Sequence, residues 1–388
     1  ALARIGWMML AAAVFTAGAS LILRLVAAPV LETFDNPLTA ISLISATAFF
    51  LPSLFAGVPA PVLAVVAMRD REESEKALGI MFAAGAVGAI FGTLLAGFLF
   101  ISWLGSTATL QAMAAFYAFS AIVLFVTARS HAATLGGTAS MIALGFLLGW
   151  RALTAPEICD VESSYYCIRT ETLSEANKAP VRVMILDHLA HGISAQDVPQ
   201  VMYTDHTAML DTLSRMRMGD RQFSSFHIGG GTYSVPRAWA SRGLSGITVA
   251  EIDPAVTRVA AREFWFDPNS ATVLHKDARD VLRASNIRYD VIVGDAFTDI
   301  AVPAHLVTKE FFALVQTRLN PTGIFAMNIV DNVDRLKALA SMYRTLRSVF
   351  PSVEVWTEAS PPQPGERRVF VILAASADSP RSAIEALT

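Results

Sequence analysis

Long apolar runs fill the first 150 residues of the chain, and each is at least about as long as the 20 or so residues that cross a bilayer as a helix. The runs lie near 4–28, 38–68, 78–103, 107–128 and 136–153. The second run is longer than one straight span, and Pro52, Pro59 and Pro61 predict a kink or break within it. The pattern predicts an α-helical transmembrane bundle over residues 1–155, with five spans if each run crosses once.

The pattern changes beyond Pro156, where the apolar runs become short. Two of them, 165–172 and 181–187, consist of β-forming residues on either side of a polar stretch. They predict a small β-hairpin domain over residues 156–210.

From residue 223 onward, short apolar strands alternate with segments of helix length, which predicts βαβ units and a mostly parallel sheet. The expected strands are 223–228, 246–250, 271–274, 289–293, 323–329, 353–357 and 368–374. We therefore expect a seven-stranded Rossmann-like sheet of the class I methyltransferase type over residues 211–388, with its last two strands antiparallel.

Composition supports this division into two halves. Of all residues, 54% are hydrophobic and 16% are charged, whereas about 25% are charged in an ordinary soluble protein. The first 150 residues hold few of the charges, so a lipid bilayer is the expected partner of that half. The net charge of −3 gives no basic surface, which excludes nucleic acid as an expected partner.

Charge also bears on the side of the membrane. Lys and Arg collect in the loop 69–76 and at Arg129, which favours the cytoplasm for these loops of a bacterial inner-membrane protein. With five spans the C-terminal half then faces the outer side, and an even helix count reverses this. Cys159 and Cys167 are eight residues apart, and an oxidising outer compartment would permit a disulfide between them. Two free cysteines are the alternative.

Four consecutive strand ends carry residues suited to a nucleoside. The first strand runs into Gly229-Gly230-Gly231, where a ligand can approach the backbone, and the second ends at Glu251, which can accept bonds from ribose hydroxyls. Asp277 and Asp295 follow the third and fourth strands. A tight turn and helix caps explain each feature singly. Together, at the edge where open α/β sheets bind ligands, they predict a nucleoside-shaped pocket.

On these residues, the region 162–375 resembles the spermidine synthase (polyamine aminopropyltransferase) family, and the apolar half resembles the multi-span segment fused to such domains in bacteria. The motifs of the family's β-domain are matched by Leu186-Asp187 and Tyr203-Thr204-Asp205. The resemblance implies that decarboxylated S-adenosylmethionine, or S-adenosylmethionine itself, binds at Gly229, Gly230, Gly231, Glu251 and Asp277.

The resemblance also implies an amine substrate and assigns its chemistry. Asp295 is the expected base that deprotonates the attacking amine, with Tyr203 and Asp299 positioning it. The residues expected to line the substrate site are Asp187, His191, Asp205, Tyr233 and Phe297. The two aromatic side chains could face the donor's cation. His206 is a second histidine candidate for the amine pocket, and a homodimer is left open.

Departures from the family motif put polyamine synthesis in doubt. Thr232 stands where the family has the aspartate that holds the aminopropyl amine, and His191 stands in place of a glutamine. The second acid after the fourth strand, Asp299, is displaced by one residue. No histidine pair has a tight metal-binding spacing, so no metal is expected.

Two other functions are compatible with the sequence. On the outer side no S-adenosylmethionine is supplied, but the same acids could serve a cofactor-free glutaminyl cyclase, in which a peptide's N-terminal glutamine amine attacks its own side-chain amide. Alternatively, the domain is non-catalytic and senses a ligand. The acids at Glu251 and Asp277 favour cofactor-dependent transfer.

Overall fold

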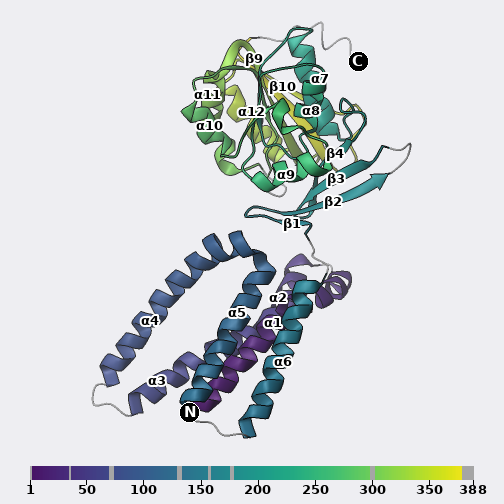
Figure 1. Ribbon diagram of the computed structural model, residues 1–388. Helices are drawn as coiled ribbons and strands as arrows, with labels where there is room; N and C mark the ends of the chain where they lie inside the picture. The colour runs from purple at the N-terminus through teal and green to yellow at the C-terminus, as the bar shows by residue number, and fades with distance from the viewer. Residues whose placement is uncertain are drawn as a thin grey trace. The chain divides into compact units, whose positions relative to one another are not determined.

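The computed structural model describes residues 2–34, 36–69, 74–128, 133–155, 159–174, 179–297 and 302–377 of the 388-residue chain. Contacts divide the chain into two compact units, Ala1–Glu157 and Ile158–Thr388 (Figure 1). The first unit is helical where it is described, and the second contains two β-sheets with helices.

Helices of the first unit follow the apolar runs of the sequence. They are α1 (Leu2–Thr33), α2 (Pro37–Gly57), α3 (Pro59–Arg69), α4 (Ser74–Leu95), the π-helical segment η1 (Ala96–Phe100), α5 (Ile101–Thr127) and α6 (Ala133–Thr154). The expected break in the second run falls at Val58, so that Pro59 begins α3, where its missing N–H costs no helical hydrogen bond. Helix α1 packs against α2, α5 and α6.

Three helical stretches among the described residues are long and apolar enough to cross a membrane: Leu2–Thr33, Pro37–Val66 and Leu78–Thr127. The expected helices 78–103 and 107–128 are thus joined into one stretch. Gly105 interrupts it with φ 76° and ψ 173°, a conformation that favours glycine. The chain turns in this region, and α4 and α5 form two arms (Figure 1).

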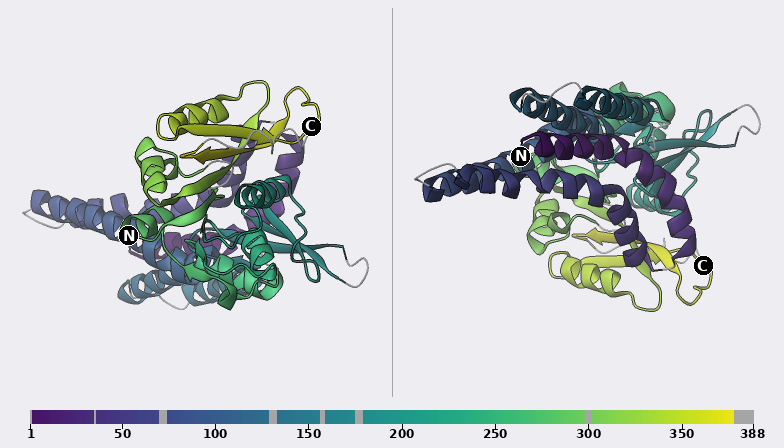
Figure 2. Two further views of the ribbon diagram at one scale, coloured as in Figure 1. Left: turned by 90° about the horizontal axis from the view of Figure 1, so that it is seen from above. Right: turned by 90° about the horizontal axis from the view of Figure 1, so that it is seen from below.

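The small sheet of the second unit has four antiparallel strands rather than the two of the expected hairpin. These are β1 (Val161–Glu162), β2 (Cys167–Ser174), β3 (Val181–Leu186) and β4 (Leu189–Ala195), in that spatial order. Strand β4 was not foreseen, because Gly192 and His191 break its β-forming pattern. The long β2–β3 hairpin extends away from the large sheet of the same unit (Figure 2).

The large sheet has the seven strands expected from the sequence. These are β5 (Ser225–Ile228), β6 (Ile247–Ala250), β7 (Thr272–Leu274), β8 (Tyr289–Gly294), β9 (Leu319–Asn332), β10 (Ser352–Thr357) and β11 (Arg367–Ala375), in the spatial order β10-β11-β9-β8-β5-β6-β7. Strands β5 to β9 are parallel, and β11 runs antiparallel between β9 and β10. The fold is that of a class I methyltransferase-type sheet.

Both faces of the large sheet are covered by helices, which explains why its central strands are mostly apolar and largely buried. The helices are α7 (Asp205–Met218), α8 (Ser234–Ser241), α9 (Pro254–Glu263), α10 (Ala278–Ala284), α11 (Lys309–Thr317) and α12 (Lys337–Arg347). On β8, Val291 and Val293 pack with α7, α8 and α9, whereas Ile292 packs with α10, α11 and α12. This packing fixes the strand ends that carry the site.

Candidate functional site

The four strand ends singled out in the sequence lie next to one another in the structure. Strand β5 is bonded to β8 on one side and to β6 on the other, and β7 follows β6. The sheet therefore places Asp295, Gly229, Glu251 and Asp277 side by side at its carboxyl edge. All four line one cavity of about 370 Å³.

The glycine loop after β5 forms the floor of this cavity. Gly229 has φ +91°, and a Cβ there would lie 2.6 Å from the carbonyl oxygen of Asp295. The β5 and β8 loops can approach each other only because residue 229 has no side chain. Gly230 and Gly231 also line the cavity, so the loop exposes backbone to a ligand as expected.

Glu251 is buried and already bonded to the backbone around it. Its Oε2 accepts the Gly230 N–H at 2.8 Å, and its Oε1 accepts the Asp253 N–H at 2.9 Å. Burial raises the pKa of Glu251, and these backbone N–H groups oppose the rise. Since a carboxylate oxygen can accept two hydrogen bonds, both oxygens retain capacity for a ribose hydroxyl.

Asp277 has a structural role as well as a place in the cavity. Its Oδ1 caps α10 by accepting the N–H groups of Arg279 and Asp280, at 2.9 and 3.2 Å. Its Oδ2 lies 2.7 Å from Nε2 of His305, which also lines the cavity. Asp277 therefore caps a helix and lines the cavity at the same time.

Asp295 is held by a residue that sequence reasoning missed. Asn328 on β9 is 4% exposed, and its Nδ2 donates to Asp295 Oδ1 at 2.8 Å. Asp295 Oδ2 lies 3.8 Å from Nε2 of His206 on α7. The carboxylate is thus fixed through one oxygen while the other faces a histidine in the cavity.

Two acceptor atoms that have no hydrogen-bond partner among the residues described complete this end of the cavity, Asn328 Oδ1 and His191 Nε2. The Asn328 Oδ1 is buried without a partner, and the donation to Asp295 settles which end of the amide it is. His191 Nδ1 lies 2.9 Å from the carbonyl of Leu189, so this nitrogen carries the proton of the neutral ring. Burial lowers the pKa of His191, and its buried Nε2 has no partner. The part of the cavity around Asp295, Asn328 and His191 therefore suits a ligand that donates hydrogen bonds from N–H groups.

Three of the expected catalytic and substrate residues do not line the cavity. Tyr203 is 40% exposed and does not line it, and Asp205 is exposed on the first turn of α7. Successive helical residues point about 100° apart, so His206 faces the cavity where Asp205 does not. Asp187, in the β3–β4 turn at φ 57°, accepts the Cys167 N–H at 2.9 Å. The structure thus gives none of these three residues a place in the cavity lining, and their roles stay predictions.

Tyr233 is a further correction. Its ring is fully buried and stacks on Phe266 at 4.0 Å, and its hydroxyl lies 2.6 Å from that of Thr257. Burial raises its pKa well above the usual value. A core aromatic cannot face a ligand cation. Phe297 does line the cavity, and Asp299 lies outside the described residues.

Thr232 stands where the spermidine synthase family has the aspartate of its glycine motif. It is buried, lines the cavity, and lies 2.7 Å from the Ser234 hydroxyl, which in turn lies 2.9 Å from the Ser194 hydroxyl. A Cβ on Gly192 would approach Thr232 Oγ1 to 2.3 Å, so β4 packs tightly over it. This corner of the cavity is polar and uncharged.

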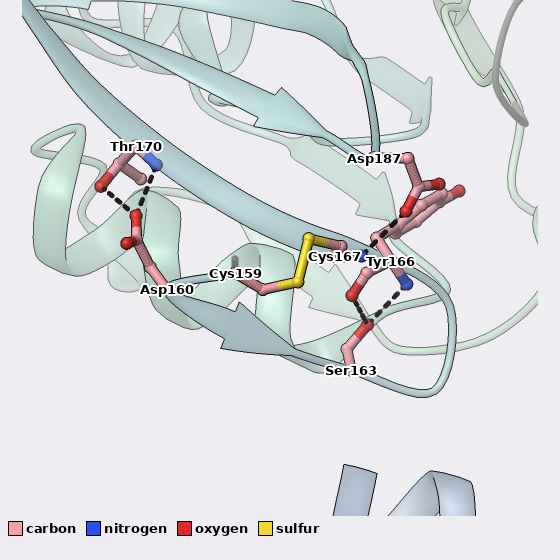
Figure 3. The surroundings of a disulfide bond; sticks show 7 residues. All are labelled: Cys159, Asp160, Ser163, Tyr166, Cys167, Thr170 and Asp187. Carbon is pink, nitrogen blue, oxygen red and sulfur yellow. Dashed lines mark hydrogen bonds between the residues drawn. A yellow bond between two sulfur atoms is a disulfide. The ribbon is translucent and has the colours of Figure 1, made fainter. Parts of the chain in front are cut away.

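The hairpin between β1 and β2 supplies another wall that the sequence did not reveal. A disulfide joins Cys159 to Cys167, and Tyr165 and Tyr166 line the cavity (Figure 3). An aromatic pair next to a cysteine matches no sequence motif, so the sequence did not indicate these two tyrosines.

Asn328 could have been found in the sequence, because it is a polar residue within an otherwise apolar stretch of β9. No cluster of three metal-ligand side chains occurs among the residues that the structure describes.

Comparisons with known proteins agree with this architecture. Residues 228–381 match the spermine/spermidine synthase domain. The chain is 33% identical over 163 residues to an N-terminal histidine N-methyltransferase of Emericella nidulans, covering 40% of this chain and 28% of that protein. It is 30% identical over 151 residues to a polyamine aminopropyltransferase of Vibrio vulnificus, covering 38% and 48%. The chain thus spans less than half the length of either relative.

A solved structure extends the likeness to the fold. The crystal structure of a probable spermidine synthase from Corynebacterium glutamicum superposes with a TM-score of 0.51 at 20% identity, covering 58% of this chain and 82% of that one. Residues 228–381 of the second unit therefore resemble the spermine/spermidine synthase domain in sequence, and the first unit is an apolar helical region.

Proposed function

We propose that this protein is a membrane-anchored transferase that moves a group from an S-adenosyl sulfonium to an amine. The observation that carries the proposal is the placement of Glu251, Asp277 and Asp295 around one cavity, beside a glycine loop with its backbone exposed. The match to the spermine/spermidine synthase domain supports the donor class.

The donor half of the cavity fits a nucleoside. Glu251 has free acceptor capacity toward ribose hydroxyls, and the glycine loop Gly229-Gly230-Gly231 lines the cavity beside it. When bound, an S-adenosyl sulfonium supplies an electrophilic carbon: the amine nitrogen bonds to it as the carbon–sulfur bond breaks, and sulfur keeps the electron pair as a neutral thioether. The cavity therefore needs no group to stabilise a leaving anion.

The acceptor half handles the amine and its proton. Asp295 Oδ2 takes the proton that the nitrogen loses as it attacks. Asn328 Oδ1 and His191 Nε2 accept the remaining N–H groups, and Asn328 Nδ2 holds Asp295 in place. His206, 3.8 Å from Asp295, can receive the proton next.

The acceptor we propose has one reacting amine and an uncharged remainder. A polyamine carries a second cation that needs a second acid, but Asp187 and Asp205 lie outside the cavity. The described wall beside Asp295 instead carries His191 and apolar side chains such as Leu189. A peptide N-terminus meets this description, and the relative from Emericella nidulans is named for transfer to an N-terminal histidine.

A second candidate is favoured by the Cys159–Cys167 disulfide. Disulfides persist in oxidising compartments, so the Cys159–Cys167 bond favours a location outside the cytoplasm, where S-adenosylmethionine is not supplied. Cofactor-free glutaminyl cyclisation, with Asp295 as base, is the reaction that this location favours. The two relatives described above are named for methyl and aminopropyl transfer, so transfer stays the leading candidate.

Calorimetry on the full chain in detergent distinguishes the two candidates. The transferase should bind S-adenosylmethionine, its decarboxylated form or methylthioadenosine. If none of the three binds, donor-dependent transfer is excluded. Release of ammonia from a peptide with N-terminal glutamine would then establish the cyclase, and a protein inactive in both assays would be a non-catalytic domain.

A further inference from the structure

The disulfide-closed hairpin, residues 159–167, contacts both halves of the ligand cavity. At its base, strand pairing joins Glu162 to Cys167, and Cys167 makes two hydrogen bonds with Asp187: its N–H donates to the Asp187 carboxylate, and its C=O accepts the Asp187 N–H at 2.8 Å. The disulfide between Cys159 and Cys167 cross-links the two ends of the hairpin (Figure 3). The covalent bond thus fixes the tip of the hairpin relative to the small sheet.

Toward the donor half, the hairpin acts through Ser163. The Ser163 hydroxyl donates to Asp253 Oδ2 at 2.5 Å and accepts the N–H of Tyr166 at 2.9 Å. Asp253 is 2% exposed; its Oδ1 caps α9, and its own N–H donates to Glu251 Oε1. One continuous chain of hydrogen bonds therefore runs from the hairpin to the carboxylate expected to hold ribose.

Toward the acceptor half, the hairpin acts through Tyr166. Its hydroxyl donates to the carbonyl oxygen of Phe297 at 3.3 Å, two residues beyond Asp295. Burial, with the carboxylates of Glu251 and Asp253 nearby, raises the pKa of Tyr166 to about 12. The phenol therefore keeps the proton with which it holds the loop after β8.

We propose that the Cys159–Cys167 hairpin is a clamp on the ligand cavity, in which Ser163 positions Glu251 through Asp253 and Tyr166 positions the loop after Asp295. Reduction of the disulfide frees both Glu251 and the loop after Asp295 from the hairpin, so the affinity for the ligand depends on the redox state of the protein. Ser163 and Tyr166 are positioning residues. The ligand in this inference is the nucleoside of the proposed function, on which the inference rests.

The first test compares oxidised and reduced full-length protein. Tris(2-carboxyethyl)phosphine converts the disulfide and one water to two thiols, and the phosphine becomes its oxide. We expect methylthioadenosine to bind about tenfold more weakly after reduction. The double variant Cys159→Ser/Cys167→Ser should bind as the reduced protein does and not respond to the phosphine. Equal affinity of the oxidised and reduced proteins would overturn the clamp.

Conservative variants separate positioning from a general loss of structure. Ser163→Ala should weaken binding about tenfold, because the bond to a buried carboxylate is lost, whereas Ser163→Thr keeps a hydroxyl and should restore affinity. Ser164→Ala is the matched control, since Ser164 is exposed in the same hairpin. Failure of Ser163→Thr to bind better than Ser163→Ala contradicts the role of the hydroxyl.

Hydrogen exchange keeps the inference testable if the nucleoside assignment fails. Amides of residues 251–253 and 295–297 should exchange faster after reduction, whether or not a ligand binds. Unchanged exchange at both segments overturns the clamp. Faster exchange in a protein that binds no nucleoside would support the clamp and reject only the proposed function.

Discussion

Asp295→Asn should reduce transfer to an amine by about 10²- to 10⁴-fold, the range expected when a general base is lost. An asparagine has the same shape, and its oxygen can still accept the Asn328 N–H that now reaches Asp295 at 2.8 Å. Fold and nucleoside binding should therefore persist. The measurement is the release of the thioether nucleoside from an S-adenosyl donor with a panel of primary amines.

The control for this variant is Asp205→Asn. Asp205 belongs to the motif that implied a substrate role, but it is exposed on α7 and does not line the cavity. Its loss should change activity less than about twofold, the size of a weak helix-terminus effect. A fully active and folded Asp295→Asn protein would show that the base lies elsewhere.

Glu251→Ala should weaken nucleoside binding by about a hundredfold or more. The change removes an acceptor for ribose and leaves the buried N–H groups of Gly230 and Asp253 without the carboxylate that now accepts them at 2.8 and 2.9 Å. Glu251→Gln should lie between wild type and alanine, because an amide retains one acceptor oxygen. Calorimetry with methylthioadenosine measures both variants.

Glu310→Gln is the corresponding control. Glu310 is an exposed glutamate on the first turn of α11 and does not line the cavity. The Glu310→Gln protein should therefore bind the nucleoside with wild-type affinity. Thermal unfolding of each variant separates lost contacts from lost structure. Wild-type affinity in folded Glu251→Ala would remove the ribose assignment.

The large sheet could be predicted from sequence because local patterns define it. Each central strand is a short, mostly apolar run with a glycine or an acid at its end or just beyond it, and buried parallel strands need such runs. The same locality places Glu251, Asp277 and Asp295 at strand ends. Once parallel strands pair, their carboxyl ends must meet at one edge. The position of these residues could therefore be predicted from the order of the strands along the chain.

The acceptor half could not be predicted in this way. Whether His206 or Asp205 faces the cavity depends on the rotation of α7, and the motif gave no measure of that rotation. Tyr233 follows the glycine loop in sequence, but it is turned into the core by its left-handed backbone at φ 56°. Asn328 lies 33 residues beyond its partner Asp295.

The sequence by itself determined an apolar helical half, a seven-stranded α/β half and the strand-end residues that line one cavity. These depend on hydrophobic period and strand order, which are local properties. Only the tertiary structure decided which side chains hold Asp295, which motif residues lie outside the cavity, and that the hairpin closed by Cys159 and Cys167 bonds to Asp253 and Phe297. Such contacts join residues distant in the chain, and no local pattern specifies them.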